Sequence, residues 1–117
     1  MAFNGFKPFD VVVVPFPFTD GPKSKRRPAM VLSSSNFSEK IGHSLMAMIT
    51  SAKNVPWPLD VPIRDLKKAG LPSESVVRMK LFTLDHRFVI RIIGTLAESD
   101  QRAIKKSLSL LLARVLI

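Results

Sequence analysis

The 117-residue chain contains no cysteine, which excludes disulfides, thiolate nucleophiles and thiolate metal ligands. No apolar run approaches the roughly 18 residues that a membrane-spanning helix needs, so we expect no membrane association. The first ten residues lack the basic segment and the apolar segment of a secretory signal. We therefore expect a cytoplasmic protein, and the length suits a single domain over residues 1–117.

Acidic residues are also scarce, with 9 Asp and Glu against 18 Lys and Arg and a net charge of +9. This excess predicts an anionic partner, and RNA, DNA, anionic lipid and an acidic protein all qualify. The acids are scattered, so a two-metal nuclease site would have to be built from unrelated positions. Phosphate-loop, dinucleotide and zinc-protease motifs are absent from the sequence. We therefore expect neither a metal ion nor a cofactor.

Short β-type segments separated by Gly, Pro and polar residues make up most of the chain. Strands are predicted at residues 10–18, 28–35, 44–52, 59–63, 75–84 and 89–96, with a helical turn within 64–72. The first segment is apolar on both alternating faces, as expected of a strand buried on both sides. From about residue 97, an apolar helical stripe is formed by Ile104, Leu108, Leu111, Leu112 and Val115. The predicted fold is mainly β, a small, partly open β-barrel with a C-terminal amphipathic α-helix.

The densest positive charge lies in a predicted loop over residues 19–28. Four cations stand within five residues there: Lys23, Lys25, Arg26 and Arg27. Such a cluster suits phosphates, because the planar arginine fork grips two phosphate oxygens and stays charged at physiological pH. Arg27 also precedes Pro28, which restrains the backbone at the entry to the next strand. The alternative interpretation is a solvated surface loop, since charged loops are common.

Hydroxyl and imidazole groups are the other candidates for chemistry. Thr50 and Ser51 close the third predicted strand, and their hydroxyls would meet Arg27 if neighbouring strand ends align. Capping of a turn is the alternative role for such hydroxyls. His43 and His86 are the two histidines of the chain and form a weaker acid–base candidate, since each is predicted to lie in a loop.

Three aromatic residues are candidates for stacking on unpaired bases, which is how proteins usually recognise single-stranded RNA. They are Phe16, Phe18 and Trp57, the last of which stands between two prolines. Packing in the core is the alternative, and it is favoured for the two phenylalanines.

Several segments of the chain, taken in order, resemble a known family. They are DVVVVPFPFTDGPKSKRRPAMVLSSS from residue 10, MITSAK from residue 48, SVVRMKLFTLD from residue 75, and the C-terminal amphipathic helix. Together they cover nearly the whole chain and resemble the MazF/PemK toxins of bacterial type II toxin–antitoxin systems. The family commonly has glycine where this chain has Phe9, directly before the first strand.

The resemblance implies an SH3-like barrel that forms a homodimer and cleaves single-stranded mRNA sequence-specifically, without a metal ion. It also implies a cognate acidic antitoxin protein as a partner. The functional arginine of the family matches Arg27, and its functional threonine matches Thr50. The residues then expected to bind RNA are Lys23, Lys25, Arg26, Ser51, Phe18, Trp57 and Arg78.

RNA carries its own nucleophile, the 2′-hydroxyl, so an enzyme need only position the backbone, move protons and stabilise charge on phosphorus. Arg27 suits the stabilising role and Thr50 suits holding the phosphate. The expected products carry a 2′,3′-cyclic phosphate and a 5′-hydroxyl. Two alternatives remain open at this point: a non-enzymatic toxin of the same fold that poisons DNA gyrase, as CcdB proteins do, and an inactive RNA-binding module.

Overall fold

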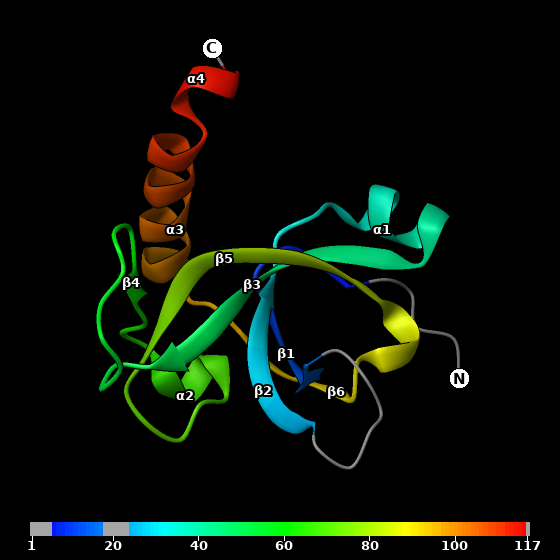
Figure 1. Cartoon of the computed structure of the whole chain (residues 1–117), viewed down its shortest axis with the longest axis horizontal. Coiled ribbons are helices and arrows are strands. Elements are labelled where there is room, and N and C mark those ends of the chain that lie inside the picture. The colour runs from blue at the N-terminus through cyan, green and yellow to red at the C-terminus, as the bar shows by residue number, and fades with distance from the viewer. Residues whose placement is uncertain (1–5, 18–23, 117) are drawn as a thin grey trace.

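A single antiparallel sheet curls into a half-barrel in the computed structural model, which describes residues 6–17 and 24–116 (Figure 1). The strands are β1 (Asp10–Phe16), β2 (Lys25–Val31), β3 (His43–Ser51), β4 (Val61–Pro62), β5 (Ser75–Asp85) and β6 (Arg91–Thr95). Their order in the sheet is β4-β5-β3-β2-β1-β6. The helices are α1 (Ser35–Ile41), α2 (Leu66–Ala69), the 3-10 turn η1 (His86–Phe88), α3 (Glu98–Leu111) and α4 (Ala113–Leu116). The predicted partly open barrel with a C-terminal helix is confirmed.

Both faces of the central strands are buried, each in its own apolar cluster. Val11 of β1 points into a cluster that includes Ile104 of α3, whereas Val12 and Val14 point into a second cluster around Phe6. Alternate residues of one strand face opposite sides of a sheet. The unbroken apolar run of β1 is thus explained by burial on both sides, as predicted.

The basic segment belongs to a strand and not to a loop. Lys25, Arg26 and Arg27 are the first residues of β2, paired in register with Phe16, Pro15 and Val14 of β1. The prediction of a loop over residues 19–28 was therefore wrong from residue 25 onward. Cross-strand pairing outweighed the local turn signals, because strand formation depends on the neighbouring strand more than on intrinsic preference.

The polar stretch at residues 36–43 contains a helix that was not predicted. Ser34 caps α1 by accepting a hydrogen bond from the amide of Phe37, and Gly42 ends the helix in a left-handed conformation. Both are standard helix boundary residues, so the signal was present in the sequence. The preceding strand consequently ends at Val31 and not at residue 35.

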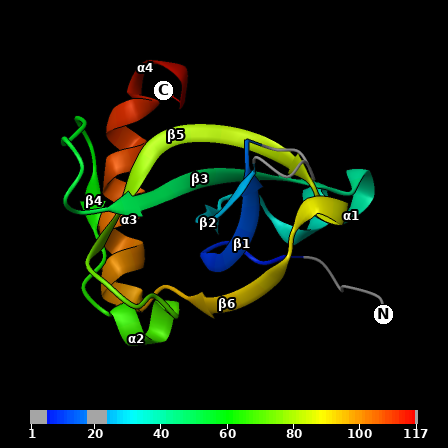
Figure 2. The same cartoon turned by 60° about the horizontal axis from the view of Figure 1, so that its bottom comes forward.

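The C-terminal helix is amphipathic, but only its first half is covered. Ile104 is buried and Leu108 packs against the same cluster, whereas Leu111 and Val115 are exposed. In Figures 1 and 2, α3 begins beside β4 and β5, and α4 lies beyond the sheet. The buried carboxylate of Asp100 anchors the start of α3 by accepting bonds from the amides that precede α2. Within the described part of the chain, no helix has the length and apolar character needed to span a membrane.

Phe9 adopts a backbone conformation that normally favours glycine. Its φ angle is +73°, in the left-handed region where a Cβ is strained. The Phe9 carbonyl accepts a bond from the amide of Leu96, and its side chain packs on the core beside Lys105. Strand β1 nevertheless begins at Asp10, as predicted, because these contacts hold the turn in place.

Candidate functional site

A cavity of about 180 Å³ lies where β2, β3 and β5 meet the loop that follows β3. Its lining residues are Phe16, Arg27, Met48, Ile49, Thr50, Asn54, Trp57, Arg78 and Lys80. Strands β2 and β3 are antiparallel, and Ala29 pairs with Met48. Arg27 lies two residues before Ala29 and Thr50 two residues after Met48, so both lie at the same edge of this strand pair. The structure thus brings together the two residues that the sequence predicted to form the site.

The donors of Arg27 and Thr50 remain available to a ligand. Arg27 is exposed, and within residues 6–17 and 24–116 its guanidinium makes no hydrogen bond or ion pair. Thr50 is half-buried, and its Oγ1 accepts a 2.6 Å hydrogen bond from Nδ2 of Asn54. Because a hydroxyl that accepts still has its own hydrogen to donate, both residues can donate to the same anion.

A bulge in β5 directs two more cations toward the cavity. Three residues of β5 lie between Val77 and Leu81, whereas one residue of β3 lies between their partners Ile49 and Ala47. Bulges bend a strand and redirect its side chains, and they are frequent beside active sites. Arg78 and Lys80 come from this bulged stretch, and both line the cavity.

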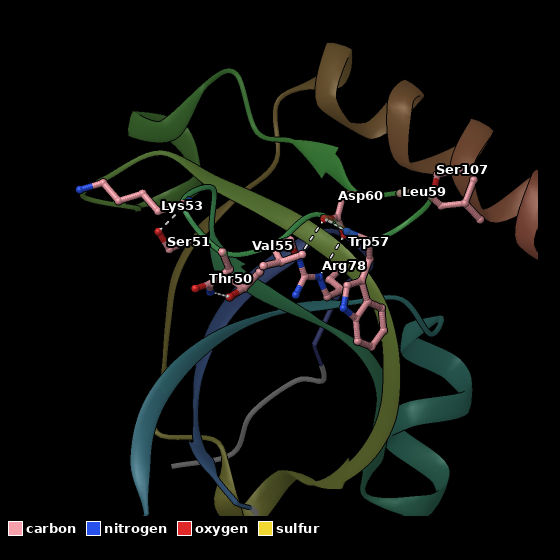
Figure 3. A network of polar contacts seen from close by, with 10 residues as sticks. Thr50, Ser51, Lys53, Val55, Trp57, Leu59, Asp60, Arg78 and Ser107 are labelled. Carbon is pink, nitrogen blue, oxygen red and sulfur yellow. Dashed lines mark hydrogen bonds and ion pairs between the residues drawn. The ribbon is translucent and has the colours of Figure 1, made fainter.

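Arg78 is engaged within the chain. Its Nε donates to Oδ1 of Asp60 at 3.1 Å and its Nη2 to Oδ2 at 3.0 Å, while Nη2 also donates to the Val55 carbonyl at 2.8 Å (Figure 3). The guanidinium lies over the Trp57 ring, 4.9 Å from its centre. Burial acts to raise the pKa of Asp60, but the bonds from Arg78 and from the Trp57 amide outweigh it and hold that pKa below its usual value.

The other predicted RNA-binding residues are dispersed around this cavity. Lys25 is exposed at the start of β2, and Ser51 lines a neighbouring hollow of about 180 Å³ together with Arg27 and Thr50. Arg26 lines a different cavity of about 410 Å³, which Arg27 also borders. Two further predicted residues, Phe18 and Lys23, lie outside the described residues.

The two histidines lie at the opposite end of β3 from Thr50. His43 is the first residue of β3 and His86 lies in η1, so their prediction as loop residues was wrong. The Nε2 atom of His86 is 2.7 Å from Oγ of buried Ser44, and burial together with the nearby His43 lowers the pKa of His86. Neither histidine lines the Arg27–Thr50 cavity.

No group of three His, Cys, Asp or Glu residues that could hold a metal ion is found among the described residues. Sequence reasoning did not identify Asn54, Asp60 and Lys80 as part of the site. The sequence pattern could have identified Lys80, because it lies two residues after Arg78 in a predicted strand and alternate residues of a strand share a face. No local pattern could have identified Asp60, since it lies 18 positions before Arg78 in the sequence.

Comparison with known proteins agrees with this architecture. A family model described as "PemK-like, MazF-like toxin of type II toxin-antitoxin system" matches residues 7–112. No curated protein sequence matches significantly.

Among solved structures, the Mycobacterium tuberculosis toxin MazF-mt6 is similar with a TM-score of 0.72 and 20% identity, over 89% of this chain and 96% of that chain. A MazE–MazF structure from Deinococcus radiodurans has a TM-score of 0.73 and 22% identity, over 92% and 96% of the two chains. An endoribonuclease in complex with its cognate antitoxin, from a mycobacterial species, has a TM-score of 0.70 and 14% identity, over 95% and 96%. These likenesses show a shared fold.

Proposed function

We propose that this chain, a member of the PemK-like and MazF-like toxins of type II toxin–antitoxin systems, is an endoribonuclease. It cuts single-stranded RNA in an active site that contains Arg27 and Thr50. The observation that carries the proposal is their convergence on one cavity, where the Arg27 guanidinium has no partner among the described residues. An exposed guanidinium that has no partner among the described residues and stands beside a hydroxyl suits a phosphate group.

The proposed reaction is an attack within the RNA backbone. The 2′-hydroxyl oxygen forms a bond to the adjacent phosphorus and gives up its proton, while the bond from phosphorus to the 5′-oxygen breaks and that oxygen gains a proton. Arg27 stabilises the added negative charge on the phosphorus-bound oxygens, and Thr50 donates to one of them. No metal ion takes part, and cleavage depends on the bases around the cut.

We further propose two protein partners. A second copy of the chain completes a homodimer, for which the exposed apolar residues Leu111, Val115 and Leu116 supply surface. A cognate acidic antitoxin suits the net charge of +9. Two structural neighbours are a MazE–MazF structure and an endoribonuclease in complex with its cognate antitoxin. Antitoxin binding is expected to cover Arg27, so cleavage that persists at saturating antitoxin would count against this part of the proposal.

The decisive experiment incubates labelled single-stranded RNA with the parent protein in excess EDTA and identifies the product ends. A 2′,3′-cyclic phosphate and a 5′-hydroxyl are expected. The variants Thr50→Val and Arg27→Ala, purified in the same way, are expected to lose activity, which excludes a contaminating ribonuclease.

Three results would overturn the proposal. The first is a 3′-hydroxyl with a 5′-phosphate, or cleavage that requires an added divalent metal. The second is RNA binding that is salt-sensitive but yields no product, which indicates a binding module. The third is inhibition of gyrase supercoiling without RNA cleavage, which indicates a gyrase poison.

A further inference from the structure

The loop that joins β3 to β4 is held firmly at both of its ends. At its start, Nδ2 of Asn54 donates to Thr50. At its end, the carbonyl of Leu59 accepts a 2.7 Å bond from Oγ of Ser107 on α3 (Figure 3). Trp57 stands between these anchors with a proline on each side, and proline fixes φ and restricts the residue before it.

Asp60 joins the backbone and the side chain of this loop to β5. Its carboxylate accepts bonds from Nε and Nη2 of Arg78 and a 2.9 Å bond from the amide of Trp57. The side chains of Arg78 and Asp60 are only 11% and 12% exposed, so salt screens this ion pair far less than a surface pair. One ion pair therefore positions both the Trp57 backbone and, through the guanidinium, its ring.

The indole ring has accessible surface beside the phosphate-binding residues. The Arg78 guanidinium covers one face of the ring, yet the residue remains 44% exposed and lines the cavity shared by Arg27 and Thr50. A similar pair stands in the same cavity, where Nζ of Lys80 lies over the Phe16 ring at 5.3 Å. Aromatic rings next to backbone-binding cations are the usual platform for unpaired bases.

We infer that Trp57 forms a stacking subsite for an unpaired nucleobase next to the phosphate held at Arg27 and Thr50. Arg78 and Asp60 are positioning residues that build this subsite, and Arg78 does not itself bind the phosphate. The inference rests on the proposed function for its substrate class, single-stranded RNA. Arg78 acts on RNA binding by positioning Trp57, because the Arg78 guanidinium is already bound to Asp60 and to the Val55 carbonyl.

Trp57 provides its own optical probe, because the chain has one tryptophan and no tyrosine. The first experiment titrates the protein with a fully 2′-O-methylated RNA of random sequence, about 12 nucleotides long. This RNA lacks the 2′-hydroxyl and is not cut. Stacking is expected to quench the Trp57 emission, whereas an abasic deoxyribose-phosphate oligomer of equal length is expected to bind by charge without quenching. Equal quenching by the abasic oligomer would overturn the subsite.

Affinity for the same RNA tests the contribution of the ring. Trp57→Ala is expected to weaken binding about 10-fold, since one stacked base contributes on this scale, and Trp57→Phe is expected to recover most of the loss. An unchanged affinity in Trp57→Ala would contradict the inference.

A double-mutant comparison separates positioning by Arg78 from direct phosphate binding. Arg78→Lys keeps the charge but loses the fork that holds Asp60, so it is expected to weaken RNA binding several-fold and to shift the Trp57 emission. In a Trp57→Ala background, Arg78→Lys is expected to have no further effect on affinity. A further loss of equal size in that background would show a direct contact and overturn the positioning role.

The matched control is Arg87→Lys. Arg87 forms the same kind of pair with Asp85, but its side chain is 83% exposed and it does not line the cavity. Arg87→Lys is expected to leave affinity and emission unchanged. An effect equal to that of Arg78→Lys would show that the loss is unrelated to Trp57 and would overturn the inference.

The uncleavable RNA keeps this test distinct from the proposed function. A parent protein that shows quenching by RNA but never cuts RNA would support the subsite and overturn the endoribonuclease proposal. A parent protein that cuts RNA without any quenching, and a Trp57→Ala variant with unchanged KM, would support the endoribonuclease proposal and overturn the subsite.

Discussion

The two ends of β3 both carry polar side chains, but they use them differently. At its start, the hydroxyls of Ser33, Ser38 and Ser44 bond to one another, and Ser44 continues the network to His86. At its far end, Thr50 and the neighbouring Arg27 line a cavity and keep donors available. Polar groups that satisfy one another stabilise the fold, whereas those held in place with free capacity can bind a ligand.

The two arginine–aspartate pairs show the same difference. Arg87, whose side chain is 83% exposed, pairs with Asp85, which lies opposite His43 at the start of β3, and its hydrogen bonds lower the pKa of Asp85 to about 2. Arg78 and Asp60 form a largely buried pair beside the cavity and position Trp57. Exposed pairs contribute little to stability, so only the second pair is expected to matter for ligand binding.

The largest effect is expected at the far end of β3, where Thr50 and Arg27 line the cavity. Arg27→Ala removes the stabilising cation, and kcat/KM for RNA cleavage is expected to fall about 10² to 10³-fold. Folding stability should hardly change, because the side chain is exposed. Single-turnover kinetics and urea unfolding measure the two quantities, with Arg87→Ala as a control of equal charge change. A loss below about 10-fold would remove Arg27 from the chemistry.

At the start of β3, a substitution in the serine network is expected to change folding stability and not activity. Ser44→Ala removes one of the two hydroxyl partners of Ser38 and leaves Nε2 of His86 without its hydroxyl partner, in a site where Ser44 is fully buried. The free energy of unfolding is expected to fall by roughly 1–3 kcal/mol. Cleavage measured well below the unfolding transition should be unchanged, and the exposed Ser109→Ala serves as the control. A selective loss of cleavage would mean that the two ends are coupled.

The smallest expected effect is the pH dependence of His86. Burial and His43 lower its native pKa below the ordinary value of 6.5, although Asp85 acts in the opposite direction. As the pH falls through 6.5, the unfolded chain therefore takes up a proton that the native state resists, so the free energy of unfolding decreases until the native pKa is passed. Urea unfolding at pH 7.5 and pH 5 should show a drop that is smaller in His86→Asn.

The carboxylate of Asp85 does not itself titrate between pH 7.5 and pH 5. Its stabilising contribution is present above its ordinary pKa of 3.8 and is lost only as the pH falls toward about 2. Asp85→Asn removes a negative charge that acts to raise the pKa of His86, so the drop between pH 7.5 and pH 5 is expected to persist or to grow and not to shrink. An equal drop in the parent and in His86→Asn would assign the pH dependence to another group.

The sequence alone determined the elements with strong local patterns. The apolar run of β1 predicted a strand buried on both faces, and the stripe through Ile104 and Leu108 predicted the C-terminal helix. The cation cluster before Pro28 and the hydroxyl of Thr50 made both residues candidates, and the resemblance to the MazF/PemK toxins selected them. These features were readable because each depends on spacing within one short segment.

Tertiary structure alone decided how those segments meet. It placed Lys25–Arg27 in a strand through pairing with β1, and it introduced the β5 bulge that directs Lys80 into the cavity. It also joined Asp60 to Arg78, which was predicted to bind RNA, and placed the Arg78 guanidinium over the ring of Trp57. Such contacts depend on the register of distant strands, which no local residue pattern specifies.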